Sequence, residues 1–191
     1  MSGDTAERIM DVAHRLLAER GFSAFSYADI AEAIQIRKAS IHHHFPTKVA
    51  LVVAVLERHR NRMKESLDVL DGRVAHPQAR LRKFVDHWEL CIRSMAEPFC
   101  IAALLGAELP GLPAEVQAEV GKHFKLLKGW LSKTLEQGAK DRTIKLRATS
   151  DLEADALMAI VHGAMISARV FGSSSTFKRI TANAIQQLSA N

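Results

Sequence analysis

The sequence predicts an all-α protein of about nine helices. Apolar residues recur at the three- and four-residue spacing of a helix face through most of the 191 residues, and strand-like alternation is missing. Aromatic residues are few, at 6%, whereas apolar residues reach 48%, enough for a sizeable core. The length fits one compact domain or two small ones.

The first two helices are delimited by local signals. The apolar spacing predicts a helix over residues 5–20, and Gly21 ends it at a position suited to a left-handed backbone. A second helix is expected to start at Ser26, because Asp29 follows three residues later in a capping-box arrangement.

Residues 34–48 predict a tight turn, one short helix, a proline stop and the start of a longer helix. On the short helix Ile41 and Phe45 lie four residues apart and share a face, while the small and polar residues point the other way. A helix this short needs neighbours to clamp its apolar side. The arrangement is typical of a helix-turn-helix that presents its recognition helix to the DNA major groove.

This stretch resembles the DNA-binding signature of the TetR family of transcriptional regulators. The matching positions are Ser26, Ile30, Ala31, Ile36, Ile41, His44, Phe45, Lys48 and Leu51. Three positions depart from the family pattern. Gln35 replaces the turn glycine, Arg37 replaces the capping serine and His42 replaces a tyrosine.

The resemblance implies a three-helix DNA-binding head over residues 1–46 and an effector-binding and dimerisation body over 47–191, with a linking helix over 47–70. It implies a ligand-responsive regulator, most often a repressor, which binds a near-palindromic double-stranded operator as a homodimer and is released by a small-molecule effector. The residues expected in the groove are Arg37, Lys38, Ala39, Ser40, His42 and His43. Those expected to hold phosphates are Ser26, Tyr27 and Lys48.

The body is predicted to contain helices over 48–70, 78–96, 99–109, 114–140, 152–171 and 177–188, with Pro98 opening the third of these. By resemblance, the last two helices (helices eight and nine) form the homodimer interface. The eighth is apolar on much of its circumference and keeps one side small with Gly163, Ala164, Ser167 and Ala168. A central core helix in a monomer is the alternative interpretation.

A candidate effector site starts from Phe84, Trp88, Cys91 and Met95, whose spacing places them on one stripe. The residues expected around a largely apolar cavity are Trp88, Cys91, Cys100, Leu104, Phe124, Trp130, His162 and Met165. The stretch over 100–113 resembles a TetR subgroup in which some members respond to small electrophiles. Alternatively, the stripe is ordinary core and both cysteines are small buried hydrophobes.

Charge is compatible with DNA binding. The net charge is +5, and residues 37–64 hold seven Lys/Arg and one acid, a local net of +6. A solvated helix face would show a similar cluster. A helical binding module or architectural nucleic-acid protein without ligand response is therefore the second class of function that we consider.

Other classes lack a positive signal. Neither cysteine has the spacing of a disulfide framework or a zinc site, and three consecutive histidines on a helix point about 100° apart, so we expect no metal and no cofactor. Motifs of hydrolases, nucleotide-binding enzymes and zinc proteases are missing, so we do not expect an enzyme. Without a signal peptide or an apolar run long enough for a bilayer, we expect a cytoplasmic protein with no membrane partner.

Overall fold

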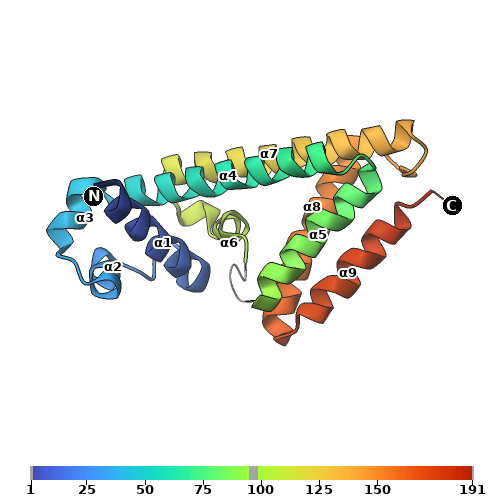
Figure 1. The fold of residues 1–191 in the computed structure, drawn as a ribbon. Helices are drawn as coiled ribbons and strands as arrows, with labels where there is room; N and C mark the ends of the chain where they lie inside the picture. The colour runs from blue at the N-terminus through green and yellow to red at the C-terminus, as the bar shows by residue number, and fades with distance from the viewer. Residues whose placement is uncertain (1, 95–98, 191) are drawn as a thin grey trace. The chain divides into compact units, whose positions relative to one another are not determined.

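The computed structural model describes residues 2–94 and 99–190. Within these residues the regular structure is helical, apart from one antiparallel bridge between Ile144 and Ser189, and the predicted all-α class is confirmed (Figure 1). The helices are α1 (Ser2–Arg20), α2 (Tyr27–Ile34), α3 (Lys38–His44), α4 (Lys48–Arg73), α5 (Pro77–Ser94), α6 (Ile101–Ala107), the 3-10 turn η1 (Leu109–Gly111), α7 (Ala114–Lys140), α8 (Ser150–Phe171) and α9 (Ser174–Gln187).

Several helices begin earlier than the sequence predicts. α1 starts at Ser2 rather than residue 5, and α9 at Ser174 rather than residue 177. α8 starts at Ser150 rather than residue 152, because the Thr149 hydroxyl accepts a hydrogen bond from the Leu152 N–H at 3.3 Å and caps the helix. The predictions made for Met95 and Pro98 lie outside the described residues.

Contacts divide the chain into two units. Unit 1 contains Met1–Arg62 and Cys100–His123, and unit 2 contains Met63–Phe99 and Phe124–Asn191. The expected head ended at residue 46, with the DNA-binding motif. By contact, residues 47–62 and 100–123 belong with that motif in unit 1.

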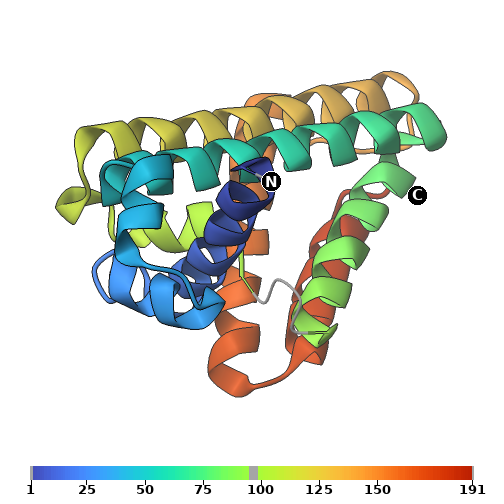
Figure 2. The same ribbon diagram turned by 60° about the vertical axis from the view of Figure 1, so that its left-hand side comes forward.

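Unit 1 is built on α1. This helix packs against α2, α3 and α6, and Figure 2 shows α2 and α3 folded beside it. Ile9, Leu17, Ile30 and Ile41 are fully buried in the core. The burial of Ile41 confirms that neighbouring helices clamp the apolar side of the short α3.

In unit 2, α9 packs against both α8 and α5, and Figures 1 and 2 show these three helices grouped together. Trp88 from α5, Leu157 from α8 and Phe177 from α9 are at most 3% exposed. Burial of Phe177 explains why α9 forms through a serine-rich start, since its first turn is held by packing.

One side of α8 carries large apolar side chains that unit 2 leaves exposed. The exposed fractions are 59% for Leu152, 37% for Ile160, 53% for Ile166, 72% for Val170 and 72% for Phe171. Leu152, Ile160, Ile166 and Val170 lie close to a helical repeat, with Gly163 between them. We call the five exposed apolar residues, these four and Phe171, the α8 stripe. An apolar stripe of this kind is typical of a surface that a partner covers.

Two small residues of α8 point elsewhere. Ala164 and Ala168 are 1% and 2% exposed, so they pack inside unit 2 rather than on the exposed side. We expected both alanines on a face available to a second subunit, and that expectation is wrong. Both alanines lie on the side of α8 that is buried in unit 2, where α8 packs against α9 and α5.

The expectation that no apolar segment could span a bilayer is also corrected. By length and composition alone α8 could cross a membrane, and 33% of its most apolar window is buried within the chain. These criteria do not distinguish a membrane span from a helix that packs on a partner subunit.

Candidate DNA-binding helix and effector residues

The turn before α3 has a left-handed residue at its centre. Gln35 has φ 55° and ψ 49°, and the Ile36 N–H donates to the Ala31 carbonyl at 3.0 Å. A non-glycine residue in this conformation costs about 1 kcal/mol. Gln35 thus takes a backbone conformation that the glycine of the family pattern would adopt without this cost.

α3 presents a free polar side. Its N-cap residue, Arg37, makes no side-chain capping bond, as expected from the loss of the serine. The predicted groove residues Arg37, Lys38, Ala39, His42 and His43 are exposed and Ser40 is partly exposed. These side chains can therefore reach a groove without rearrangement of the unit 1 core.

Two of the predicted phosphate-binding residues have bonds inside the chain. The Tyr27 hydroxyl donates to the Phe45 carbonyl at 2.8 Å and so ties the start of α2 to the end of α3. Burial raises the pKa of Tyr27, which keeps the phenol a donor. Ser26 and Asp29 form a capping box, in which the Ser26 N–H and hydroxyl each donate to the Asp29 carboxylate at 2.7 Å. The Ser26 hydroxyl bond is the main cause of the lowered pKa of Asp29.

Lys48, the third predicted phosphate ligand, also faces the protein. Its ammonium donates to the Phe25 carbonyl and lies 4.1 Å from the centre of the Phe25 ring and 4.9 Å from that of Phe22. Partial burial lowers the pKa of Lys48. The side chain thus ties the first turn of α4 to the segment before α2.

His42 contacts α2 and the segment between α3 and α4. Its ring meets the Tyr27 ring edge-on at 4.8 Å, and Nδ1 lies 3.3 Å from the Pro46 carbonyl. His43 and His44 are also edge to face, with ring centres 5.4 Å apart. The family pattern has a tyrosine at position 42, and here the His42 imidazole supplies the aromatic ring in its place.

Six of the predicted effector residues belong to unit 2. Trp88 and Met165 are each 1% exposed. The Phe124 and His162 rings lie 5.1 Å apart, and burial lowers the pKa of His162 to about 4. Cys91 is half-buried, with its sulfur 3.6 Å from Nε2 of His87.

Trp130 has a polar anchor as well as an aromatic neighbour. Its Nε1–H donates to the Asp71 carboxylate at 3.0 Å, and its ring lies 5.4 Å from that of Phe84. The Asp71 carboxylate also pairs with Arg80 at 3.6 Å. These contacts join the end of α4 to α5 and α7 inside unit 2. The remaining predicted residues, Cys100 and Leu104, belong to unit 1.

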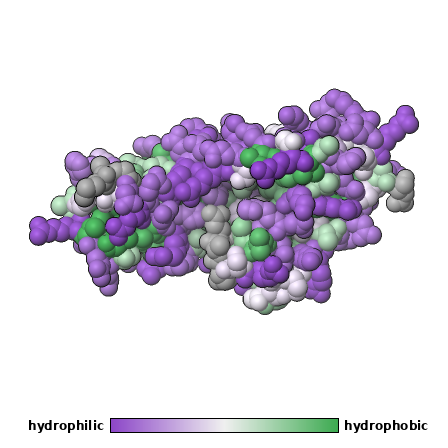
Figure 3. Space-filling model, viewed as in Figure 1, coloured by the Kyte–Doolittle hydropathy of each residue, from purple (hydrophilic) through white to green (hydrophobic). Residues whose placement is uncertain are grey.

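Two open grooves of unit 2 involve other residues. One, of about 310 Å³, is lined mainly by apolar side chains, and Figure 3 shows an apolar patch over the last turns of α4. The other, of about 380 Å³, lies along α5 and α9 and is more polar. The two grooves are lined by Met63, Ser66, Leu67, Val69, Leu70, Arg73, Val74, Lys83, Phe84 and His87, and by Arg82, Val85, Asp86, Glu89, Lys178, Thr181, Ala182, Ile185 and Gln186. Phe84 of the predicted α5 stripe lines the first groove, but the residues expected around the effector cavity line neither.

Family models decide the identity of the fold. Residues 9–55 match the model described as bacterial regulatory proteins of the tetR family, and residues 77–184 match the tetracyclin repressor-like C-terminal domain. The chain belongs to the TetR family. It is a helix-turn-helix transcriptional regulator, as the sequence resemblance implied.

Similar proteins agree over nearly the full length. The HTH-type transcriptional repressor NemR of Escherichia coli K12 is 26% identical over 176 residues, covering 87% of this chain and 85% of NemR. A TetR-family regulator from Agrobacterium tumefaciens has a TM-score of 0.98 and 38% identity, with 100% of both chains covered. A TetR regulator from Legionella pneumophila has a TM-score of 0.86 and 29% identity over 96% of each chain. The relatives are transcriptional regulators, not enzymes.

Sequence reasoning missed a contact that joins two parts of unit 1 in this TetR regulator. The Glu108 carboxylate, at the end of α6, accepts a hydrogen bond from the Phe22 N–H at 3.0 Å. Gly21 makes the approach possible. It has φ 75°, and a Cβ on it would lie 2.0 Å from the Glu108 Oε1 atom. Glu108 is 86 residues away from Phe22, so no local pattern could have paired them.

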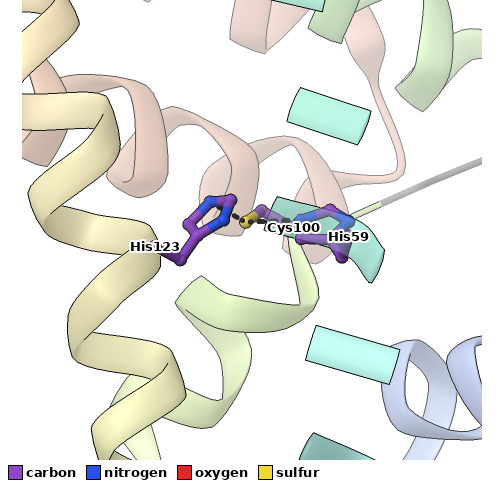
Figure 4. A group of neighbouring side chains, drawn as sticks. All are labelled: His59, Cys100 and His123. Atoms are coloured by element: carbon purple, nitrogen blue, oxygen red, sulfur yellow. Dashed lines mark hydrogen bonds between the residues drawn. The ribbon is translucent and has the colours of Figure 1, made fainter. Parts of the chain in front are cut away.

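A buried cluster around Cys100 was also missed. The Cys100 sulfur lies 3.7 Å from Nε2 of His59 and 3.6 Å from Nε2 of His123 (Figure 4). The exposed fractions are 0% for Cys100, 7% for His59 and 1% for His123. Burial, and secondarily the neighbouring His123 and His14, hold the pKa of His59 well below its usual value. The sequence shows no metal-site spacing here, because these three residues come from three separate helical segments.

Proposed function

We propose that this TetR-family chain is a ligand-responsive repressor that binds a near-palindromic operator as a homodimer in the cytoplasm. The observation that carries the proposal is the exposed polar side of α3 on a buried support, with Ile41 fully buried beneath it. A rigid helix with a free polar side can enter the major groove, and a dimer repeats it on two half-sites.

Base contacts are assigned to the exposed side of α3. Arg37 and Lys38 bring positive charge, while Ser40, His42 and His43 can donate or accept hydrogen bonds at base edges. Ala39 would allow close approach and meet a thymine methyl group. Ser26, Tyr27 and Lys48 are proposed to meet the DNA backbone beside the groove.

Of these three side chains, Lys48 keeps donors for phosphate, whereas the Ser26 and Tyr27 hydroxyls donate their single O–H to Asp29 and to the Phe45 carbonyl. The ammonium of Lys48 has three N–H donors, of which the Phe25 carbonyl takes one. The capping box also orients the start of α2, where the positive end of the helix dipole favours an anion. These residues therefore position the head on DNA rather than select its sequence.

Dimerisation is proposed through α8 and α9. The support is the α8 stripe, which exposes Ile166 and Val170 by 53% and 72%, and Ile180 of α9, which is 36% exposed. An isologous interface would cover the stripe of one subunit with the same surface of the other. A core helix in a monomer would bury such side chains, so their exposure favours the dimer.

Effector binding is assigned to largely apolar residues. In unit 2 these are Trp88, Cys91, Phe124, Trp130, His162 and Met165, and in unit 1 they are Cys100 and Leu104. The neutral imidazole of His162 against the Phe124 ring suits a hydrogen bond to an uncharged polar group of an apolar ligand. A thermal-shift screen with small carbonyl compounds, organic acids and aromatics tests this assignment. An effector should raise the melting temperature of the wild type and not that of a Trp88→Ala, His162→Ala variant.

The operator proposal is tested by fluorescence anisotropy on a library of DNA duplexes. Ser40→Ala and His43→Ala should each change base preference, with a loss of about 1–3 kcal/mol for the preferred base. Glu65→Ala, an exposed α4 variant outside the motif, serves as the control. If both α3 variants keep the wild-type preference, the assignment of α3 to the groove is refuted.

A further inference from the structure

The His59–Cys100–His123 cluster combines three side chains that bind thiophilic metals. His59 comes from α4, Cys100 is the N-cap residue of α6 and His123 comes from α7. Both imidazoles direct Nε2 toward the same sulfur, as Figure 4 shows. The three possible ligand atoms all lie within 4.8 Å of one another.

The distances match a common metal ion. A metal–sulfur bond of about 2.3 Å and a metal–nitrogen bond of about 2.0 Å place sulfur and nitrogen about 3.5 Å apart at a tetrahedral angle and about 3.7 Å apart at a trigonal angle. The two sulfur–nitrogen distances, 3.7 Å to His59 and 3.6 Å to His123, lie in this range. All three ligand atoms lie within 4.8 Å of one another, close enough for one ion to contact them after a small rearrangement of the side chains.

We propose that His59, Cys100 and His123 bind one thiophilic metal ion, and that this ion is Cu⁺. On binding, the Cys100 thiol releases its proton to solvent and the thiolate forms the metal–sulfur bond, while each imidazole supplies a lone pair. Cu⁺ and one thiolate are together neutral, whereas Zn²⁺ would leave a net charge of +1 in a buried site.

Coordination number gives the same preference. Within residues 2–94 and 99–190 the cluster offers three protein ligands, His59, Cys100 and His123. Structural zinc sites almost always have four ligands, so three ligands fit Zn²⁺ less well. Thiolate and imidazole ligands together suit Cu⁺, which accepts three-coordinate geometry, while hard ions such as Mg²⁺ prefer oxygen.

The alternative is a polar network without metal. The Cys100 S–H can donate to one imidazole while the N–H of the other donates to sulfur, so the contacts by themselves would satisfy the sulfur and both Nε2 atoms. The metal proposal differs from it in requiring all three side chains for the same ion. A metal titration on ligand variants therefore separates the two.

The position of the site offers a route to regulation. A bound ion would join the start of α6 to α4 and α7 within unit 1. The other end of α6 carries Glu108, which accepts a hydrogen bond from the Phe22 N–H in the segment that connects α1 to α2. Metal loading can thus act on the backbone that orients the DNA-binding motif. This coupling depends on the proposed operator binding, whereas metal binding itself does not.

The test is an anaerobic titration of the full chain with Cu⁺ against a coloured Cu⁺ chelator. The wild type should bind one ion, and Cys100→Ser and His123→Asn should each weaken binding by at least about 100-fold, more than the loss of an outer-shell partner. Cys91→Ser is the matched control, because Cys91 also has a histidine four residues before it at 3.6 Å. Circular dichroism and melting without metal establish that each variant is folded.

Each outcome is decisive. One-to-one binding that needs Cys100 and His123 but not Cys91 supports the site. Zn²⁺ binding with the same dependence, in place of Cu⁺, overturns the choice of ion. No binding of either ion, or equal loss in Cys91→Ser, overturns the site. If the loaded and metal-free wild type bind the operator equally, the regulatory coupling is wrong even though the operator proposal stands.

Discussion

Lys48 is expected to contribute both to the stability of unit 1 and to DNA affinity, so its replacement should have two separable effects. Its hydrogen bond to the Phe25 carbonyl is a charge-assisted one, worth about 1.5–3 kcal/mol when buried. Its position over the Phe22 and Phe25 rings adds about 0.5–1 kcal/mol for a partly exposed cation. Because the ammonium is only partly buried, Lys48→Ala should lower the free energy of unfolding by about 2 kcal/mol.

The DNA effect has a different signature. If Lys48 also neutralises one phosphate, the slope of log K against log salt concentration should become less steep by about 1 in Lys48→Ala. Affinity should fall alike on all duplexes. Urea denaturation measures the first effect, and operator anisotropy at several salt concentrations measures the second at a temperature where the variant is folded.

Lys38→Ala is the control that separates them. Lys38 is exposed on α3, so its loss should leave the free energy of unfolding within about 0.5 kcal/mol while still reducing the salt slope. A Lys48→Ala protein as stable as the wild type would refute the structural role assigned to the Phe25 bond. An unchanged salt slope would remove Lys48 from the phosphate contacts.

Three further predictions concern other parts of the chain. Ile166→Arg should yield monomers in light scattering and weaken operator binding, because Ile166 is 53% exposed on the α8 stripe. The pKa of His162 is about 4 in the folded chain against an ordinary 6.5, so the unfolded state binds the proton first as pH falls. The stability that the neutral His162 contributes, up to about 3 kcal/mol, should be present above pH 6.5 and lost as the pH falls from 6.5 to 4. The difference between the urea midpoints of the wild type and His162→Phe should therefore change over that pH range. Gly21→Ala should destabilise the chain by about 2 kcal/mol in urea, since the new Cβ needs a left-handed backbone and displaces Glu108 from the Phe22 N–H.

Each of these predictions has a control variant or an outcome that would contradict it. Leu90→Arg, at a 51% exposed position of α5, should remain dimeric, and loss of the dimer in it as well would discredit the interface assignment. Gly129→Ala, in α7 with open space around it, should stabilise by up to about 1 kcal/mol, opposite in sign to Gly21→Ala. A constant difference between the wild type and His162→Phe from pH 7 to 4 would show that the imidazole titrates normally.

The match between expectation and structure was closest where a motif is local. The capping box of Ser26 and Asp29 and the missing cap at Arg37 both depend on residues a few positions apart. Helix ends were less accurate. α9 begins three residues early because packing of Phe177 offsets the weak helix preference of its serines.

The amino-acid sequence by itself determined the helical class, the order of the helices and the exposed side of α3, because 3.6-residue periodicity, caps and proline act over a few residues. Tertiary structure alone decided which distant side chains meet. Glu108 reaches the Phe22 N–H across 86 residues, and His59 and His123 converge on a cysteine 41 and 23 residues away. Tertiary packing also decided that Ala164 lies inside unit 2 while Ile166 remains exposed. Both are apolar residues of one helix, and periodicity marks a helix face without specifying which neighbour covers it.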